Sequence, residues 1–135
     1  MENFAPYSHA IACLALWALM NVVLGMVATR GRTDAGRAPS GKPIRNYSDP
    51  VYRADRAHMN AMENSGPFIG AVVAAILAGA APFWVNVFAC VFLVARVAMA
   101  FVHIRTENQP MRSLFFVIGM VSILALVVMA LRAVI

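Results

Sequence analysis

The chain has 135 residues, of which 61% are hydrophobic and only 13% are charged. Soluble domains carry about 25% charged residues, so this composition excludes an ordinary soluble globular protein. The net charge of +5 would suit a nucleic-acid-binding protein, but the placement of the charges excludes that class. Arginine and lysine are concentrated in alternate segments between apolar runs, which is the pattern of cytoplasmic loops in a multispanning membrane protein.

The first predicted transmembrane helix covers residues 8–29. Residues 10–28 hold a single polar side chain, Asn21, and at about 1.5 Å per residue they extend about 28 Å, enough to cross the hydrocarbon core. The N-terminus lacks the basic segment of a signal peptide, so we expect this helix to be retained. Cys13 here and Cys90 in the third apolar run read as small apolar residues, and they predict neither a disulfide nor a metal site.

Residues 30–54 form a basic loop that we expect to be cytoplasmic. The segment is rich in Gly, Pro, Arg and Ser and has no apolar periodicity. Loops of this length are either disordered or functional. The composition favours disorder, or simple contact with lipid headgroups, over a functional role.

A polar stripe opens the second predicted span, residues 55–79. Four polar side chains recur at i, i+3, i+7 and i+10: Arg53, Arg56, Asn60 and Glu63. On a helix they lie within about 80° of one another. The apolar part of this segment is too short to span alone, so Glu63 is expected at or inside the hydrocarbon boundary. An ionisable residue at that depth indicates a functional site by default.

Two further spans complete the predicted fold. Residues 83–104 carry Arg96, with His103 seven positions later on the same helix face. Residues 111–134 follow Pro110, so Arg112 and Ser113 fall in the first turn of the last helix. We therefore predict that residues 1–135 form one all-α membrane domain, a four-transmembrane-helix bundle with its basic loops cytoplasmic. The short termini favour a bacterial inner membrane.

The charges near the cytoplasmic side do not balance. The stripe and its neighbours carry more cations than acids: Arg53, Arg56, Arg96 and Arg112 against Asp55 and Glu63. A buried ion pair of Glu63 with Arg96 or Arg56 would be a purely structural explanation, but a bare pair is a poor source of net stability. The surplus instead indicates a pocket for an anion that carries one ammonium group, with carboxylates held by arginine.

The motifs themselves resemble a known family. Arg56-Ala-His-Met-Asn-Ala-Met-Glu-Asn, followed by Pro67-Phe, resembles the signature of the MAPEG family, membrane-associated proteins in eicosanoid and glutathione metabolism. The resemblance continues through Phe92-Leu-Val-Ala-Arg96-Val and Gln109-Pro-Met-Arg112-Ser, and it covers about residues 50–135. It is nearest to the microsomal glutathione transferase and microsomal prostaglandin E synthase branches. It implies a homotrimer that binds glutathione between subunits near the cytoplasmic face.

The resemblance also implies roles for individual residues. Those implied to hold glutathione are Arg53, Arg56, His58, Asn60, Glu63, Arg96 and His103. Arg112, with Ser113 beside it, would stabilise the thiolate, since a free thiol is mostly protonated at pH 7. His58 lies off the stripe, so contact with a neighbouring subunit or with headgroups stands beside a ligand role. His103, at a helix end, is also typical of an interfacial or capping residue.

Departures from the family pattern narrow the function. Met99 and Phe116 stand where the prostaglandin synthase has histidine and tyrosine, and His103 stands where the relatives have tyrosine. Prostaglandin E synthase activity is therefore not expected, and glutathione binding is expected to be weaker or rearranged. The prediction is a glutathione-dependent enzyme that conjugates lipophilic electrophiles from the bilayer or reduces lipid hydroperoxides. A non-catalytic lipid-binding scaffold is the alternative; a small multidrug transporter is disfavoured because the first span has no acid.

Overall fold

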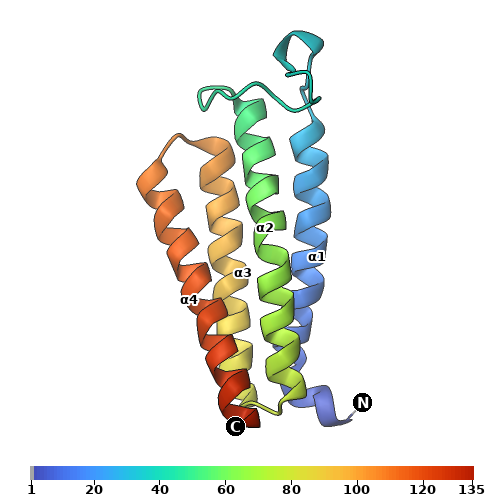
Figure 1. Ribbon diagram of the computed structural model, residues 1–135, viewed down its shortest axis with the longest axis vertical. Helices are drawn as coiled ribbons and strands as arrows, with labels where there is room; N and C mark the ends of the chain where they lie inside the picture. Colours follow the sequence, from blue (N-terminus) through green and yellow to red (C-terminus); the bar gives the residue numbers. More distant parts are fainter. Residues whose placement is uncertain (1) are drawn as a thin grey trace.

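The computed structural model describes residues 2–135 as four long helices (Figure 1). In chain order these are α1 (Ser8–Thr29), α2 (Pro50–Leu77), α3 (Pro82–Arg105) and α4 (Gln109–Val134), with short 3-10 segments η1 (Glu2–Tyr7) and η2 (Asp34–Gly36). Both chain termini lie at the same end of the bundle as the α2–α3 turn. We call this the terminal end, and the opposite end, which carries residues 30–49 and 106–108, the loop end.

Three of the helical segments are long and apolar enough to cross a membrane: Phe4–Thr29, Pro82–Arg105 and Gln109–Val134. The helix α2 is not among these segments, because the charged residues of its first half lower its mean hydropathy. At 1.5 Å per residue its 28 residues extend about 42 Å, so its length is sufficient. The predicted all-α bundle of four helices is confirmed. The second helix begins at Pro50, ahead of the expected residue 55, and continues through Pro67.

Local sequence signals explain where the helices begin and end. The Asp49 side chain accepts a hydrogen bond of 2.8 Å from the Val51 backbone N–H, which caps the start of α2. Asn108 accepts one of 3.1 Å from the Met111 N–H and caps α4 in the same way. Gly79, with φ of +68°, turns the chain after α2, a backbone conformation that favours glycine. The α2–α3 and α3–α4 connections therefore reverse the chain within a few residues and keep these neighbouring helices antiparallel.

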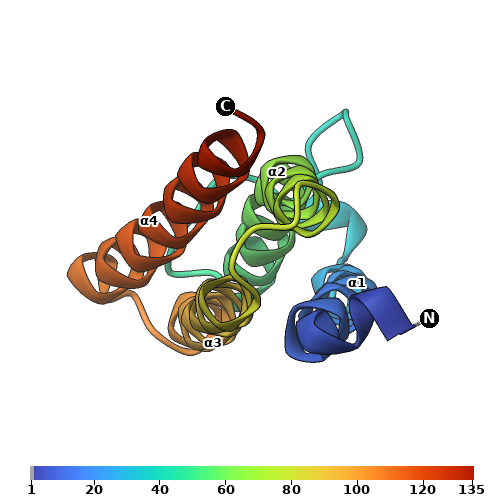
Figure 2. The same cartoon turned by 90° about the horizontal axis from the view of Figure 1, so that it is seen from below.

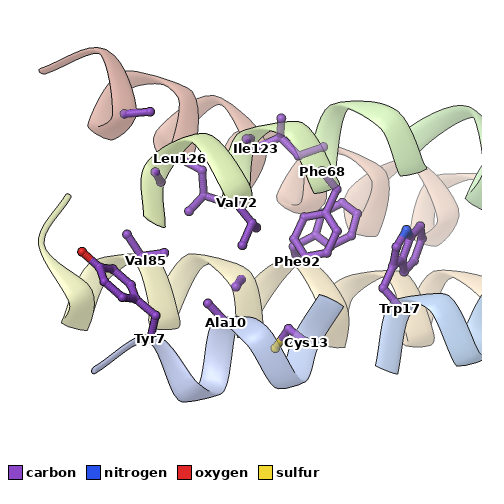
Figure 3. Packing of buried hydrophobic residues seen from close by; sticks show 14 of the residues in the cluster. Tyr7, Ala10, Cys13, Trp17, Phe68, Val72, Val85, Phe92, Ile123 and Leu126 are labelled. Carbon is purple, nitrogen blue, oxygen red and sulfur yellow. The ribbon is translucent and has the colours of Figure 1, made fainter. Parts of the chain in front are cut away.

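An aromatic cluster joins the first three helices in the middle of the bundle (Figure 3). The Phe68 and Phe92 rings stack with centroids 3.8 Å apart, and Trp17 meets Phe92 edge-on at 5.0 Å. The Trp17 indole N–H donates to Ser65 at 3.0 Å, so its polar atom is satisfied inside the core. α1 and α4 lie on opposite sides of the α2–α3 pair (Figure 2). The side chains on α2 and α3 therefore face neighbours on both sides.

The basic loop between α1 and α2 is folded against the start of α2, and the expectation of disorder is wrong. Buried Asp55 on α2 accepts from Arg32 at 2.8 Å and from Lys42 at 3.2 Å. Arg53 donates to the backbone carbonyls of Tyr47 at 2.8 Å and Ser48 at 3.1 Å. A buried carboxylate needs cationic partners, and in this chain the loop supplies them.

Replacing Asp55 by Asn is expected to release the loop. The change removes the charge that holds Arg32 and Lys42, so trypsin should cleave after Arg37 and Arg45 several-fold faster in the detergent-solubilised protein. Asp34→Asn is the matched control, because that carboxylate is fully exposed and pairs with Arg37 only at 3.5 Å. Equal cleavage rates for the two variants would show that Asp55 does not order the loop.

Candidate functional site

Arg96 is the centre of the site, and it lies inside the bundle with 2% of its surface exposed. Its Nη1 donates to Asn60 Oδ1 at 3.0 Å and contacts Met99 Sδ at 3.2 Å. The guanidinium carbon lies 5.3 Å from the centre of the Phe92 ring and 5.0 Å from that of Phe116. Amide, thioether and ring faces are all neutral, so the charge is solvated without being neutralised.

Part of the Arg96 guanidinium has no protein partner. Its Nε and Nη2 are buried without a hydrogen bond among the residues that the structure describes. An ion pair with Glu63 would have satisfied them, but Glu63 is exposed on the outward face of α2. Asp55 is already held by the loop. The buried arginine thus keeps two donors that no side chain in the described part of the protein satisfies.

Room for this side chain depends on a glycine in α4. A Cβ added at Gly119 would lie 3.0 Å from Arg96 Nε and 3.4 Å from Cζ. The guanidinium therefore packs directly against the α4 backbone. A Cβ at position 119 would require the Arg96 guanidinium or the α4 backbone to shift by a few tenths of an ångström.

His103 lies near three further arginines at the loop end of the bundle. The imidazole is buried, and neither ring nitrogen has a partner among residues 4–135. It lies within electrostatic reach of Arg53, Arg56 and Arg112. The Tyr47 ring from the loop stacks on it at 6.4 Å between centroids. We call these five residues together with Arg96 the loop-end cationic cluster.

Arg112 and Tyr47 form the outer surface of this cluster. The Arg112 guanidinium carbon lies 4.9 Å from the centre of the Tyr47 ring, and its Nη1 is buried without a hydrogen bond in the described part of the chain. Tyr47 also packs edge-on against Tyr52 at 5.1 Å. The loop thus places an aromatic face over the arginine that begins α4.

A small cavity lies between Arg96 and His103. Its volume is about 10 Å³, and its lining includes Asn60, Arg96, Met99 and His103. That volume fits about one water molecule. A peptide-sized anion therefore cannot enter the bundle, and it would have to approach the cluster from the loop end or from the exposed face of α2.

The remaining predicted residues are placed differently from one another. Arg53 is occupied by the carbonyl of Ile104 at 3.2 Å and lies 3.7 Å from Glu107, so it anchors loops. Arg56 is half-buried and Ser113 is exposed. His58 points at α1, where its Nε2 would lie 3.5 Å from a Cβ on Gly25. The structure thus brings Asn60, Arg96 and His103 around one cavity, whereas His58, Glu63 and Ser113 lie apart from it.

Sequence reasoning missed three residues of this site. Tyr47 belongs to a loop without periodicity, Met99 counted only as a departure from a family pattern, and Gly119 lies unremarked in an apolar span. A glycine facing a buried arginine from the next helix would have been a usable signal. The sequence carries no comparable signal for the Tyr47 ring, because the position of that ring depends on the contacts of Asp55 and Arg53 with the loop.

Fold and site together define an integral membrane protein with a cationic site at one end of a four-helix bundle. The family model described as the MAPEG family matches residues 10–132. The chain therefore belongs to the MAPEG family, whose members are membrane proteins of eicosanoid and glutathione metabolism. A comparison with curated proteins finds no match for the chain.

The contact between Gly119 and Arg96 can be tested with a double-mutant cycle. Gly119→Ala should lower the free energy of unfolding in mixed micelles by about 1–3 kcal/mol, because the methyl group overpacks the site. In an Arg96→Met background the flexible thioether can yield, so the same change should cost less. An equal cost in both backgrounds would mean that Arg96 does not pack against this glycine.

Proposed function

We propose that the protein is a glutathione-dependent membrane enzyme that transfers the glutathione thiolate to lipophilic electrophiles or uses it to reduce lipid hydroperoxides. The observation that carries this proposal is the loop-end cationic cluster, where Arg96 and Arg112 retain unpartnered buried nitrogens. Glutathione has two carboxylates, one ammonium and one thiol, so it supplies the negative charge that the cluster lacks. Membership in the MAPEG family supports the same ligand.

The tripeptide would bind along the outside of the bundle. Arg56 is half-buried beside the cluster and has no ion pair among residues 4–135, so it is the best placed arginine for a carboxylate. Glu63 would take the ammonium. Because that carboxylate faces outward on α2, the two charges can share one ligand only if the ligand lies against the exposed α2 face.

A second copy of the chain would complete such a site. The outward face of α2 exposes Gly66, Gly70 and Ala74 next to Glu63. Small residues at this spacing allow another helix to approach closely within a membrane. The proposed assembly is the homotrimer implied by the family resemblance, with glutathione held between neighbouring subunits. His58 packs against α1 and would support the helix without touching the ligand.

The proposed chemistry depends on Arg112. A guanidinium beside the sulfur favours the thiolate, and the released proton passes to solvent at the loop end. The thiolate then forms a carbon–sulfur bond with the electrophile, and the leaving group departs with its electron pair. In the peroxidase reaction, two glutathiones and one hydroperoxide yield glutathione disulfide, an alcohol and water. Ser113 is exposed beside Arg112 and could donate to the sulfur.

The orientation of the site follows from this proposal. Glutathione is a soluble cosubstrate, whereas lipophilic electrophiles dissolve in the bilayer. A site at the loop end lies where the two phases meet. We propose that the loop end is cytoplasmic, in agreement with its surplus of basic residues, and that the membrane is a bacterial inner membrane.

Replacing Arg112 by Ala should reduce the thiolate fraction of bound glutathione about tenfold or more, because one charge-assisted interaction is lost. The measurement is ultraviolet difference absorbance of the thiolate band in protein reconstituted into lipid nanodiscs. Arg132→Ala is the matched control: it removes an exposed arginine from the other end of α4 and should leave the band unchanged.

Turnover assays on the same variants separate the catalytic proposal from its alternative. Conjugating activity that survives in Arg112→Ala would remove the role given to this arginine. Glutathione binding without turnover of any electrophile or hydroperoxide would support the non-catalytic lipid-binding scaffold.

A further inference from the structure

The two cysteines of the chain meet inside the bundle. Cys13 on α1 and Cys90 on α3 are 77 positions apart, and their Sγ atoms lie 3.6 Å apart. Both thiols are free. The sequence predicted no relation between them, because each looks like a small apolar residue within its own span. Figure 3 labels Cys13 near Ala10, on the side of α1 that faces the core.

The two thiols differ in access from the bilayer. Cys13 is 4% exposed and belongs to the core. Cys90 lines two open grooves on the outside of the bundle, one of about 440 Å³ shared with His9 and Phe83, and one of about 300 Å³ shared with Phe115. Both grooves are mostly apolar in their lining residues. A lipophilic molecule in either groove can therefore approach Cys90. The Cys13 sulfur lies on the core side of Cys90 and contacts the Cys90 sulfur.

Two polar side chains lie one helical turn from the thiol pair, on the side of the terminal end. His9 and Cys13 are four residues apart on α1, as are Asn86 and Cys90 on α3, so each polar residue lies about 6 Å nearer the terminal end. Asn86 accepts from the Ala10 N–H at 2.9 Å and donates to the Pro6 carbonyl at 2.8 Å. These bonds hold α1 and α3 together at the mouth of the groove and leave the exposed His9 beside it.

We propose that Cys90 and Cys13 form a dithiol site that reduces apolar hydroperoxides reaching it from the bilayer. The Cys90 sulfur takes the terminal oxygen of the hydroperoxide and becomes a sulfenic acid, and an alcohol is released. The Cys13 thiol then attacks that sulfur, forming a disulfide and releasing water. One hydroperoxide is reduced by two electrons and two thiols are oxidised, so the reaction balances without glutathione.

This site is separate from the loop-end cationic cluster. Both cysteines lie in the halves of their helices nearer the terminal end, and no residue of the cluster lines either groove. Thiols in apolar surroundings are weak nucleophiles, so oxidation is expected over minutes to hours. Apolar hydroperoxides partition into the bilayer, and the apolar grooves lined by Cys90 would admit them from there.

The test uses the full chain in lipid nanodiscs with cumene hydroperoxide as the probe and no glutathione present. Peptide mass spectrometry should find a Cys13–Cys90 disulfide within one chain, and one cumyl alcohol should form for every two thiols lost. In Cys13→Ser, a dimedone adduct should appear on Cys90. In Cys90→Ser, Cys13 should stay reduced, because it is shielded from the bilayer.

A second probe tests the contact of the thiols without peroxide. Phenylarsine oxide bridges two neighbouring thiols, so both cysteines of the protein treated in its native state should resist maleimide added after denaturation, and neither single variant should be protected. Unprotected cysteines, disulfides only between chains, or oxidation of Cys13 in the Cys90→Ser protein would each overturn the proposal. Because glutathione is absent, these outcomes leave the proposed glutathione reaction untouched.

Discussion

The structure depends on a buried guanidinium that no acid among the described residues neutralises. Arg96 lies among an amide oxygen, a thioether and two aromatic rings, and α4 makes room for it with Gly119. A full positive charge in such surroundings is costly, and the cost falls when a negative ligand comes near. The hydrogen bond from Arg96 to Asn60 links α3 to α2. A displacement of Arg96 would therefore also disturb the helix that carries the polar stripe.

The loop between α1 and α2 leaves the loop-end cationic cluster with fewer acids to compensate its charge. Asp55 could have compensated an arginine of the cluster, but it is held by Arg32 and Lys42. Glu107 is largely exposed and reaches Arg53 only at 3.7 Å. The folded loop thus occupies Asp55 and lays Tyr47 over Arg112. A site prepared in this way favours an anionic ligand with more than one acidic group.

The sequence predicted what depends on local pattern, and it failed where distant segments meet. The all-α bundle and the placement of Arg96 and Arg112 on its third and fourth helices follow from hydropathy and prolines, whereas α2 begins five residues before the expected position. The fold of residues 30–49 depends on contacts with α2, which composition does not encode. The direction of His58 depends on the rotation of α2 against α1. The meeting of Cys13 with Cys90 likewise requires α1 and α3 to be neighbours in a known register.

The most direct test of the central claim, that the loop-end cationic cluster binds a tripeptide anion, is equilibrium binding of labelled glutathione to the wild-type protein in nanodiscs at several salt concentrations. The account predicts saturable binding that S-alkylated glutathione displaces. The affinity should fall as salt rises, because partly exposed arginines such as Arg56 are screened. Absence of saturation at millimolar glutathione, or binding that is indifferent to salt, would contradict it.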